Sequence, residues 1–227
     1  MARSDEIQFY GSERHLLRQL GRHRNAFTAE VLKQACFDRG TIEWLDFPVT
    51  NQGKDREWMG LEMLDNKDYT RVLEYWKTFW PASGNQMNWD AVGWLKHEGK
   101  KQLVLVEAKA NGEELISSCQ AASPKSINHI RQTFDRVKQD LNALQSSNWM
   151  ERYYQYANRL TVLWFLQKNG VDTRLLFIYF TGDHIEGKTC PQNAGQWKTF
   201  LDQQEQHLGL PAGHALESYI HKIFVKV

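Results

Sequence analysis

The chain has 227 residues, of which 41% are hydrophobic, and its 28 basic and 27 acidic residues give a net charge of +1. This length and composition suit a single domain with a sizeable core, covering residues 1–227. The nearly neutral charge argues against tight, unspecific nucleic-acid binding, so any nucleic-acid site must be a local patch.

The three cysteines, Cys36, Cys119 and Cys190, have none of the spacings of a zinc site or a disulfide framework. The first residues lack the hydrophobic core of a signal peptide, and no hydrophobic run reaches membrane-spanning length. The sequence therefore predicts a soluble cytoplasmic protein with no membrane contact.

The N-terminal part is expected to supply helix and then strand. Hydrophobic residues recur at helical spacing over residues 12–37, and Gly21 is expected to divide this helix into two. Residues 41–49 have the composition of a first strand, which Pro48 and the turn residues 51–53 should end.

Residues 51–87 form an expected insertion between the first strand and the next. Its aromatic segment 69–79 is predicted to be helical, and the loop 82–85 follows Pro81. Five of the nine tryptophans lie in or near this insertion, and most should pack in the core, with base stacking a lesser role.

The most informative stretch is residues 88–111, which are predicted to form a β-hairpin. Its turn lies at Glu98 and Gly99, where glycine allows the positive φ that a tight turn needs. A two-residue turn there places Asp90 opposite Glu107. Because side chains alternate along a strand, Lys109 should share their face, so two carboxylates and one amine are expected at one strand end.

Two carboxylates that face each other repel, unless a raised pKa or a cation neutralises them. A Glu-x-Lys triplet alone is common on solvated surfaces. However, the run from Leu103 to Val106 that leads into this triplet is hydrophobic, so it should be buried and should carry acids only for a reason. Both faces of the hairpin are hydrophobic, which predicts helices on both sides of a sheet and hence a three-layer α/β fold.

Asp90, the hairpin and the triplet Glu107-Ala108-Lys109 together resemble the signature of the PD-(D/E)XK nuclease superfamily, although Trp89 stands where that signature has proline. The resemblance implies a three-layer α/β/α fold with a central mixed sheet and a restriction-endonuclease-like αβββαβ core. It also implies Mg²⁺, or Mn²⁺ as a substitute, held by Asp90, Glu107 and the carbonyl of Ala108. Lys109 would then position the attacking water.

In that superfamily the helix before the sheet often adds a further acid to the metal site. Glu30 fits by position, and Glu62 is its rival. In the helicase-nuclease branch a later helix carries a glutamine near the metal. Gln155 is similar to that residue, and Arg159 is a candidate phosphate contact on the same helix.

The C-terminal half is expected to complete the αβββαβ order. Helices are predicted over residues 126–144 and 149–167, a buried strand over 175–181, and a surface helix over 196–207. Residues 220–227 should form an edge strand, with Lys222 and Lys226 discouraging further strand pairing.

The leading hypothesis is a Mg²⁺-dependent nuclease that hydrolyses phosphodiester bonds in nucleic acid, with DNA expected rather than RNA. The alternative is a binding module for nucleic acid or protein that keeps the nuclease fold without turnover. A third hypothesis is a nuclease subunit that stays silent until a partner delivers DNA. The sequence leaves a homodimer and a protein partner open.

Overall fold

The computed structural model describes residues 11–64, 66–81 and 86–227. Residues 1–10 of the N-terminal segment, and the whole loop expected at residues 82–85, lie outside this range.

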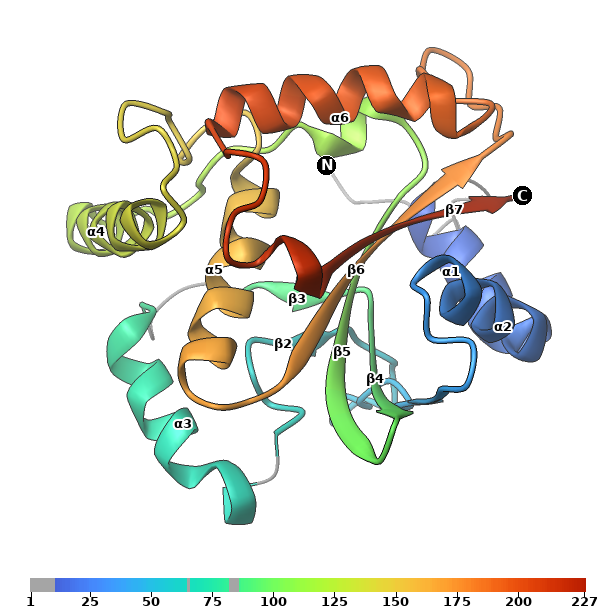
Figure 1. Cartoon of the computed structure of the whole chain (residues 1–227), viewed down its shortest axis with the longest axis horizontal. Helices are drawn as coiled ribbons and strands as arrows, with labels where there is room; N and C mark the ends of the chain where they lie inside the picture. The colour runs from blue at the N-terminus through green and yellow to red at the C-terminus, as the bar shows by residue number, and fades with distance from the viewer. Residues whose placement is uncertain (1–10, 65, 82–85) are drawn as a thin grey trace.

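The fold is built on a five-stranded mixed sheet with strand order β1-β4-β5-β6-β7 (Figure 1). Its strands are β1 (Thr41–Trp44), β4 (Ala91–His97), β5 (Lys100–Lys109), β6 (Thr173–Thr181) and β7 (Ile220–Lys226). The first three pair antiparallel, whereas β5, β6 and β7 pair parallel. The protein is therefore of the mixed α/β class, and the expected edge strand at the C-terminal end is confirmed.

The helices are α1 (Ser12–Arg22), α2 (Arg24–Gln34), α3 (Asn66–Phe79), α4 (Pro124–Asp140), α5 (Tyr154–Lys168) and α6 (Ala194–Leu208), with short 3-10 turns η1 (Gly112–Leu115) and η2 (Glu217–Tyr219). In Figure 1, α1 and α2 lie on one side of the sheet and α5 lies on the other. A separate hydrophobic cluster fills each side. On β5, Leu103 and Leu105 belong to one cluster, whereas Val104 and Val106 belong to the other. The prediction that both faces of the hairpin are buried is confirmed.

Two predicted boundaries are wrong. The N-terminal helix breaks at His23, which has a non-helical φ of −120° and ψ of 19°, and not at Gly21. An α-helix tolerates an interior glycine at a cost of about 1 kcal/mol, so Gly21 stays within α1. The first strand ends at Trp44, and Val49 makes only an isolated bridge to Asp55.

The later helices also shift. Helix α4 begins at Pro124, because Ser123 caps its end by accepting a hydrogen bond from the Ser126 amide, and proline is well tolerated in a first turn. Helix α5 begins at Tyr154 and not near residue 149, since Tyr153 is bridged to Ser117 and leaves the helical conformation.

The expected insertion contributes β2 (Trp58–Met59) to a second, two-stranded sheet, whose other strand is β3 (Asn88–Trp89). Residues 88–89, predicted as the start of the hairpin, thus pair with β2 and not with β5. The predicted helix over residues 69–79 is confirmed, with a start at Asn66 and an irregular turn at Tyr69. Trp76, Trp80 and Trp89 are all buried in the hydrophobic cluster that also holds α5. The core-packing role expected for most tryptophans is therefore confirmed for these three.

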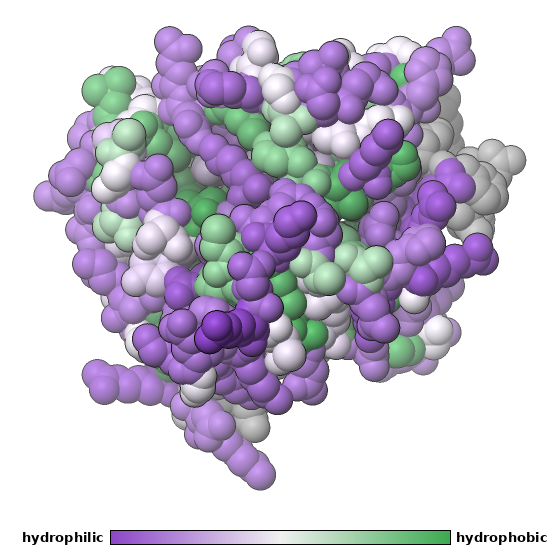
Figure 2. Space-filling view, turned by 45° about the vertical axis from the view of Figure 1, so that its right-hand side comes forward, coloured by the Kyte–Doolittle hydropathy of each residue, from purple (hydrophilic) through white to green (hydrophobic). Residues whose placement is uncertain are grey.

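Hydrophilic side chains cover most of the face shown in Figure 2, and hydrophobic side chains emerge between them in small separate areas. Among the described residues, no helix combines the length and the hydrophobicity needed to cross a bilayer.

Candidate active site

The β4–β5 hairpin has the turn and the register that the sequence predicts. Glu98 and Gly99 have φ values of 49° and 75°, and the ladder runs from the His97–Lys100 pair to the Ala91–Val106 pair. Positive φ at both turn residues matches the twist of the two strands. The hairpin thus brings Asp90, one residue before β4, to the C-terminal end of β5.

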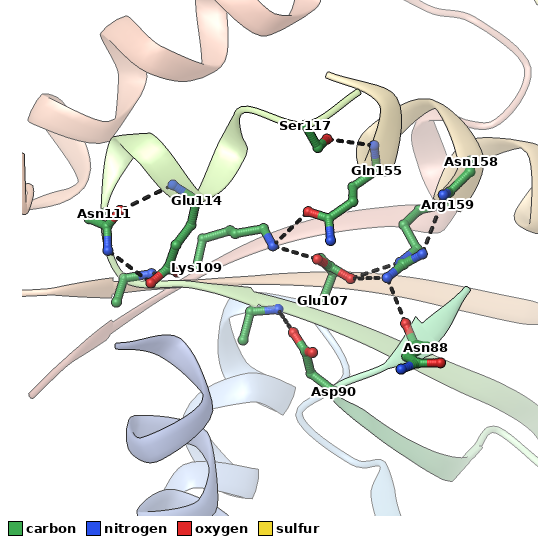
Figure 3. A network of polar contacts seen from close by, with 12 residues as sticks. Asn88, Asp90, Glu107, Lys109, Asn111, Glu114, Ser117, Gln155, Asn158 and Arg159 are labelled. Carbon is green, nitrogen blue, oxygen red and sulfur yellow. Dashed lines mark hydrogen bonds and ion pairs between the residues drawn. The ribbon is translucent and has the colours of Figure 1, made fainter. Parts of the chain in front are cut away.

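Asp90 meets β5 differently from the expectation. It does not pair directly opposite Glu107, because its amide donates to the Val106 carbonyl at 3.2 Å and its carboxylate accepts from the Ala108 amide at 2.6 Å (Figure 3). The ladder with β4 ends at the Ala91–Val106 pair, so no residue of β4 lies opposite Ala108. A buried amide needs an acceptor, and the Asp90 carboxylate supplies it.

Glu107 and Lys109 share one face of β5, as strand alternation predicts. The Lys109 ammonium donates to Oε1 of Glu107 at 2.6 Å, and Nε of Arg159 donates to Oε2 at 2.7 Å. All three side chains are buried. Lys109 also donates to the side-chain oxygen of Gln155 at 3.2 Å. Helix α5 therefore holds the Glu107–Lys109 pair from above, as Figure 3 shows.

Arg159 makes the rest of its contacts within the protein. Its guanidinium donates to the Asn158 side chain at 2.7 Å and to the Asn88 carbonyl at 2.6 Å, and it lies 4.8 Å from the centre of the Trp89 ring. The structure thus brings both Gln155 and Arg159 next to the Glu107–Lys109 pair. In this structure, however, Arg159 anchors Glu107 and β3, so its hydrogen bonds are directed at protein groups and not at a phosphate.

Burial raises the pKa of Asp90 to about 8, and the negative charge of nearby Glu107 adds to this effect. Lys109 and the Ala108 amide act in the opposite direction without cancelling it. A carboxyl group in this state is largely protonated at neutral pH. When Asp90 does ionise, the neighbouring protein groups do not fully compensate its negative charge.

Glu107 and Lys109 hold each other in their charged forms. Burial alone pushes the pKa of Glu107 upward, but the cations of Arg159 and Lys109 outweigh burial and leave this pKa below its ordinary value. Burial alone pushes the pKa of Lys109 downward, but Glu107 and Asp90 outweigh it and leave this pKa raised. Lys109 is thus a fixed ammonium that donates hydrogen bonds and does not accept protons.

These side chains line a cavity of about 780 Å³ that includes Asp90, Glu107, Lys109 and Gln155. A second cavity, of about 130 Å³, meets Asp90 from the side of α1.

Three further acids, which the sequence does not indicate as site residues, lie at these cavities. Glu57 lines both, and Asp55 and Glu13, the latter in the first turn of α1, line the smaller one. The charge of Glu57 also contributes to the raised pKa of Asp90. The sequence indicates Glu13 only through its position on the first predicted helix. No local pattern indicates Glu57, because the path of the insertion alone brings it to the site.

The two acids expected to complete the site lie elsewhere. Glu30 accepts a hydrogen bond from Gln34, whose side chain in turn bonds the backbone of Phe224 on β7. Glu62 pairs with Arg56 and accepts from the Met59 amide. Neither Glu30 nor Glu62 is among the described residues that line the two cavities.

The oxygen donors available to a cation are the carboxylates of Asp90 and Glu107 and the carbonyl of Ala108. In an extended strand the amide and the carbonyl of one residue point to the same side, so the Ala108 carbonyl faces the edge where Asp90 bonds the Ala108 amide. Mg²⁺ usually takes only one or two carboxylates and fills its shell with water. This small donor set fits Mg²⁺, although the described residues contain no cluster of three or more His, Cys, Asp or Glu side chains arranged for a metal.

No family model, no curated protein and no solved structure matches this chain. The geometry of the site is therefore the basis for its chemistry.

Proposed function

We propose that this protein is a Mg²⁺-dependent nuclease that hydrolyses phosphodiester bonds in nucleic acid. The observation that carries the proposal is the meeting of Asp90, Glu107 and Lys109 at one cavity, where the half-buried Asp90 has a raised pKa beside a buried ion pair. Strongly perturbed carboxylates in a cavity are typical of active sites. DNA rather than RNA is proposed on the resemblance of the motif alone.

The arrangement of elements supports a restriction-endonuclease-like core. The order α2, β1, β4, β5, α5, β6 reproduces the αβββαβ sequence, with the antiparallel strands first and the parallel pair after them. Helices α1 and α2 and helix α5 on opposite sides are what a three-layer α/β/α fold requires (Figure 1). The acid and the acid-x-lysine lie on consecutive segments of the central hairpin, as in the superfamily signature.

In this proposal Asp90, Glu107 and the Ala108 carbonyl hold Mg²⁺ or Mn²⁺. When bound, the cation supplies positive charge that stabilises the negative charge developing on the phosphodiester. Asp90 loses its proton on binding, since a carboxylate must be ionised to act as a ligand. Arg159 keeps the Glu107 carboxylate in one orientation through Oε2.

The protonation state and the position of Lys109 suit it to orient the attacking water. Its ammonium is charged and buried and is directed by Glu107 and Gln155, so it enters the reaction already in place. A fixed cation beside the reacting phosphate stabilises the transition state without reorganisation. Gln155 acts through Lys109 as a positioning residue.

The test is cleavage of single-stranded, double-stranded and branched DNA with Mg²⁺, Mn²⁺ or EDTA, by wild type, Lys109→Ala and Lys109→Arg. We expect metal-dependent cleavage, with a loss of about 10²- to 10³-fold in kcat for Lys109→Ala. Lys109→Arg should also be impaired, because a planar guanidinium cannot replace a compact ammonium. Undiminished cleavage by Lys109→Ala would point to another site or a contaminating enzyme.

One observation favours the alternative of a binding module without turnover. Both carboxylate oxygens of Glu107 are already occupied, by Lys109 and by Arg159. A buried, charge-paired network of this kind also occurs as a purely structural feature. If the wild type cleaves nothing under any metal, yet binds nucleic acid or a protein equally well with and without Lys109, the binding module replaces the nuclease.

A further inference from the structure

We propose that the large cavity at Asp90 and Lys109 receives an unpaired nucleotide of a single strand, so that the substrate is single-stranded and not base-paired. This inference rests on the proposed nuclease function and specifies the substrate of the same site. Size, lining and placement of the cavity each support it.

The size of the cavity excludes a base-paired duplex from its interior. At about 780 Å³, it falls in the range of about 300–1,000 Å³ that is typical of small-molecule pockets. A duplex is far too large for such a space. Enzymes whose reacting atoms lie in a pocket of this kind act on single strands or flip the nucleotide out of the stack.

Apart from Asp90 and Glu57, the lining beyond the ion pair carries neutral hydrogen-bonding groups. One wall, ahead of Asp90 in the chain, contributes Gln86 and Asn88, and the other, at the start of α4, contributes Gln120, Ser123 and Ser126. Amide and hydroxyl side chains of this kind form hydrogen bonds with the edges of unpaired bases and with sugar hydroxyls. Between them lie hydrophobic side chains that can cover the face of a base, among them those of Met87 and Ile130.

Positive charge is confined to the floor of the cavity. Among the described residues that line it, the only cationic side chains are Lys109 and Arg159, and both are buried and paired with Glu107. Proteins that follow the phosphate backbone do so with several exposed lysines and arginines. The walls therefore suit the neutral base and sugar, whereas the one place for a phosphate is the floor beside Lys109.

The walls, which suit the base and the sugar, lie next to the floor, which suits the phosphate. Residues 117–123 lead from η1, which follows β5, into α4, and Gln86 and Met87 lead into β3, which ends one residue before Asp90, so both walls are close in the chain to the groups at the floor. Figure 3 shows Ser117 and Gln155 on one side of the pair and Asn88 on the other. A phosphate at Lys109 would thus place its own nucleotide between the walls.

The test is a binding measurement that does not need catalysis. Fluorescence anisotropy in EDTA, and again in Ca²⁺, would compare a labelled 12-nucleotide single strand with the blunt duplex of the same sequence. We expect the single strand to bind at least tenfold more tightly. A substitution in the wall, Ala122→Trp, fills the cavity with a large ring at an exposed position outside the catalytic groups.

Ala122→Trp should weaken single-strand binding at least tenfold, whereas Gln132→Trp, at an exposed position of α4 that does not line the cavity, should leave it unchanged. Circular dichroism melting of both variants controls for folding. Equal or tighter binding of the blunt duplex, or single-strand binding unaffected by Ala122→Trp, overturns the inference while the nuclease proposal stands if Mg²⁺-dependent cleavage is seen. Absence of nucleic-acid binding and of cleavage together overturns both.

Discussion

The half-buried carboxyl group of Asp90 makes the stability of the metal-free protein fall as pH rises. Its pKa is raised to about 8 in the folded protein, first by burial and then by the charge of Glu107, with Lys109 and Glu57 as the other charged groups that face it. An aspartate in an unfolded chain has a pKa of about 3.9. Between these two values the folded state holds a proton that the unfolded state has released, so stability falls as pH rises.

The size of this effect follows from the shift. Each pH unit inside the window lowers the free energy of unfolding by up to about 1.4 kcal/mol, so the loss between pH 6.5 and pH 8 is about 1.5 kcal/mol. Asp90→Asn keeps an oxygen that can accept from the Ala108 amide but has no proton to lose. The variant should therefore be more stable than wild type at pH 8 by a few kcal/mol, and the difference should shrink toward pH 5.

Urea denaturation in EDTA from pH 5 to pH 8.5 measures this difference. His221 also contributes to the pH dependence in the acid part of this range, because burial and then Arg174 lower its pKa in the folded protein to about 4, while a histidine in an unfolded chain titrates near pH 6.5. Its contribution is present above the unfolded pKa of about 6.5 and is lost as pH falls, and it cancels when the variant is subtracted from wild type. Asp46→Asn, at an exposed side chain, is the matched control. Equal pH dependence in wild type and Asp90→Asn would refute the reasoning.

The remaining predictions concern the surroundings of the site. Arg159→Met should lower the free energy of unfolding by about 3 kcal/mol in urea denaturation, because it leaves one oxygen of the buried Glu107 carboxylate without its cation; an unchanged midpoint would contradict this. Tyr179→Phe should raise stability by about 1 kcal/mol, since the buried Tyr179 hydroxyl finds no hydrogen-bond partner among the described residues, and a loss of stability would show that the hydroxyl is satisfied. Glu30→Gln should leave metal-dependent cleavage unchanged, because Glu30 bonds Gln34 away from the cavities, and a large loss of activity would return Glu30 to the site.

The sequence predicts those parts of the site that depend on local rules. The turn at Glu98 and Gly99 follows from glycine chemistry, and the shared face of Glu107 and Lys109 follows from strand alternation. The departure of Asp90 from the ladder could not be predicted in this way. It depends on where β4 ends relative to β5, and hence on which group satisfies the Ala108 amide.

Contacts between residues far apart in the chain could not be predicted from the sequence either. Arg159 lies 52 residues from Glu107 in the chain, and no local pattern indicates that the two form an ion pair. The same holds for Glu57, which the insertion carries to the cavity at Asp90. The position of Glu30 on the helix before the sheet makes it a candidate metal ligand, but the helix break at His23 gives α2 a direction of its own, and Gln34, the hydrogen-bond partner of Glu30, bonds the backbone of β7.

The most direct test of a metal site at Asp90 is a crystal structure of the protein soaked in Mn²⁺, with data collected for anomalous scattering. The nuclease proposal predicts an anomalous peak between the carboxylates of Asp90 and Glu107, at about 2.0–2.2 Å from an Asp90 oxygen, that is absent in Asp90→Asn. No peak at saturating Mn²⁺, or a peak that remains in Asp90→Asn, would contradict the assignment of Asp90 as a metal ligand.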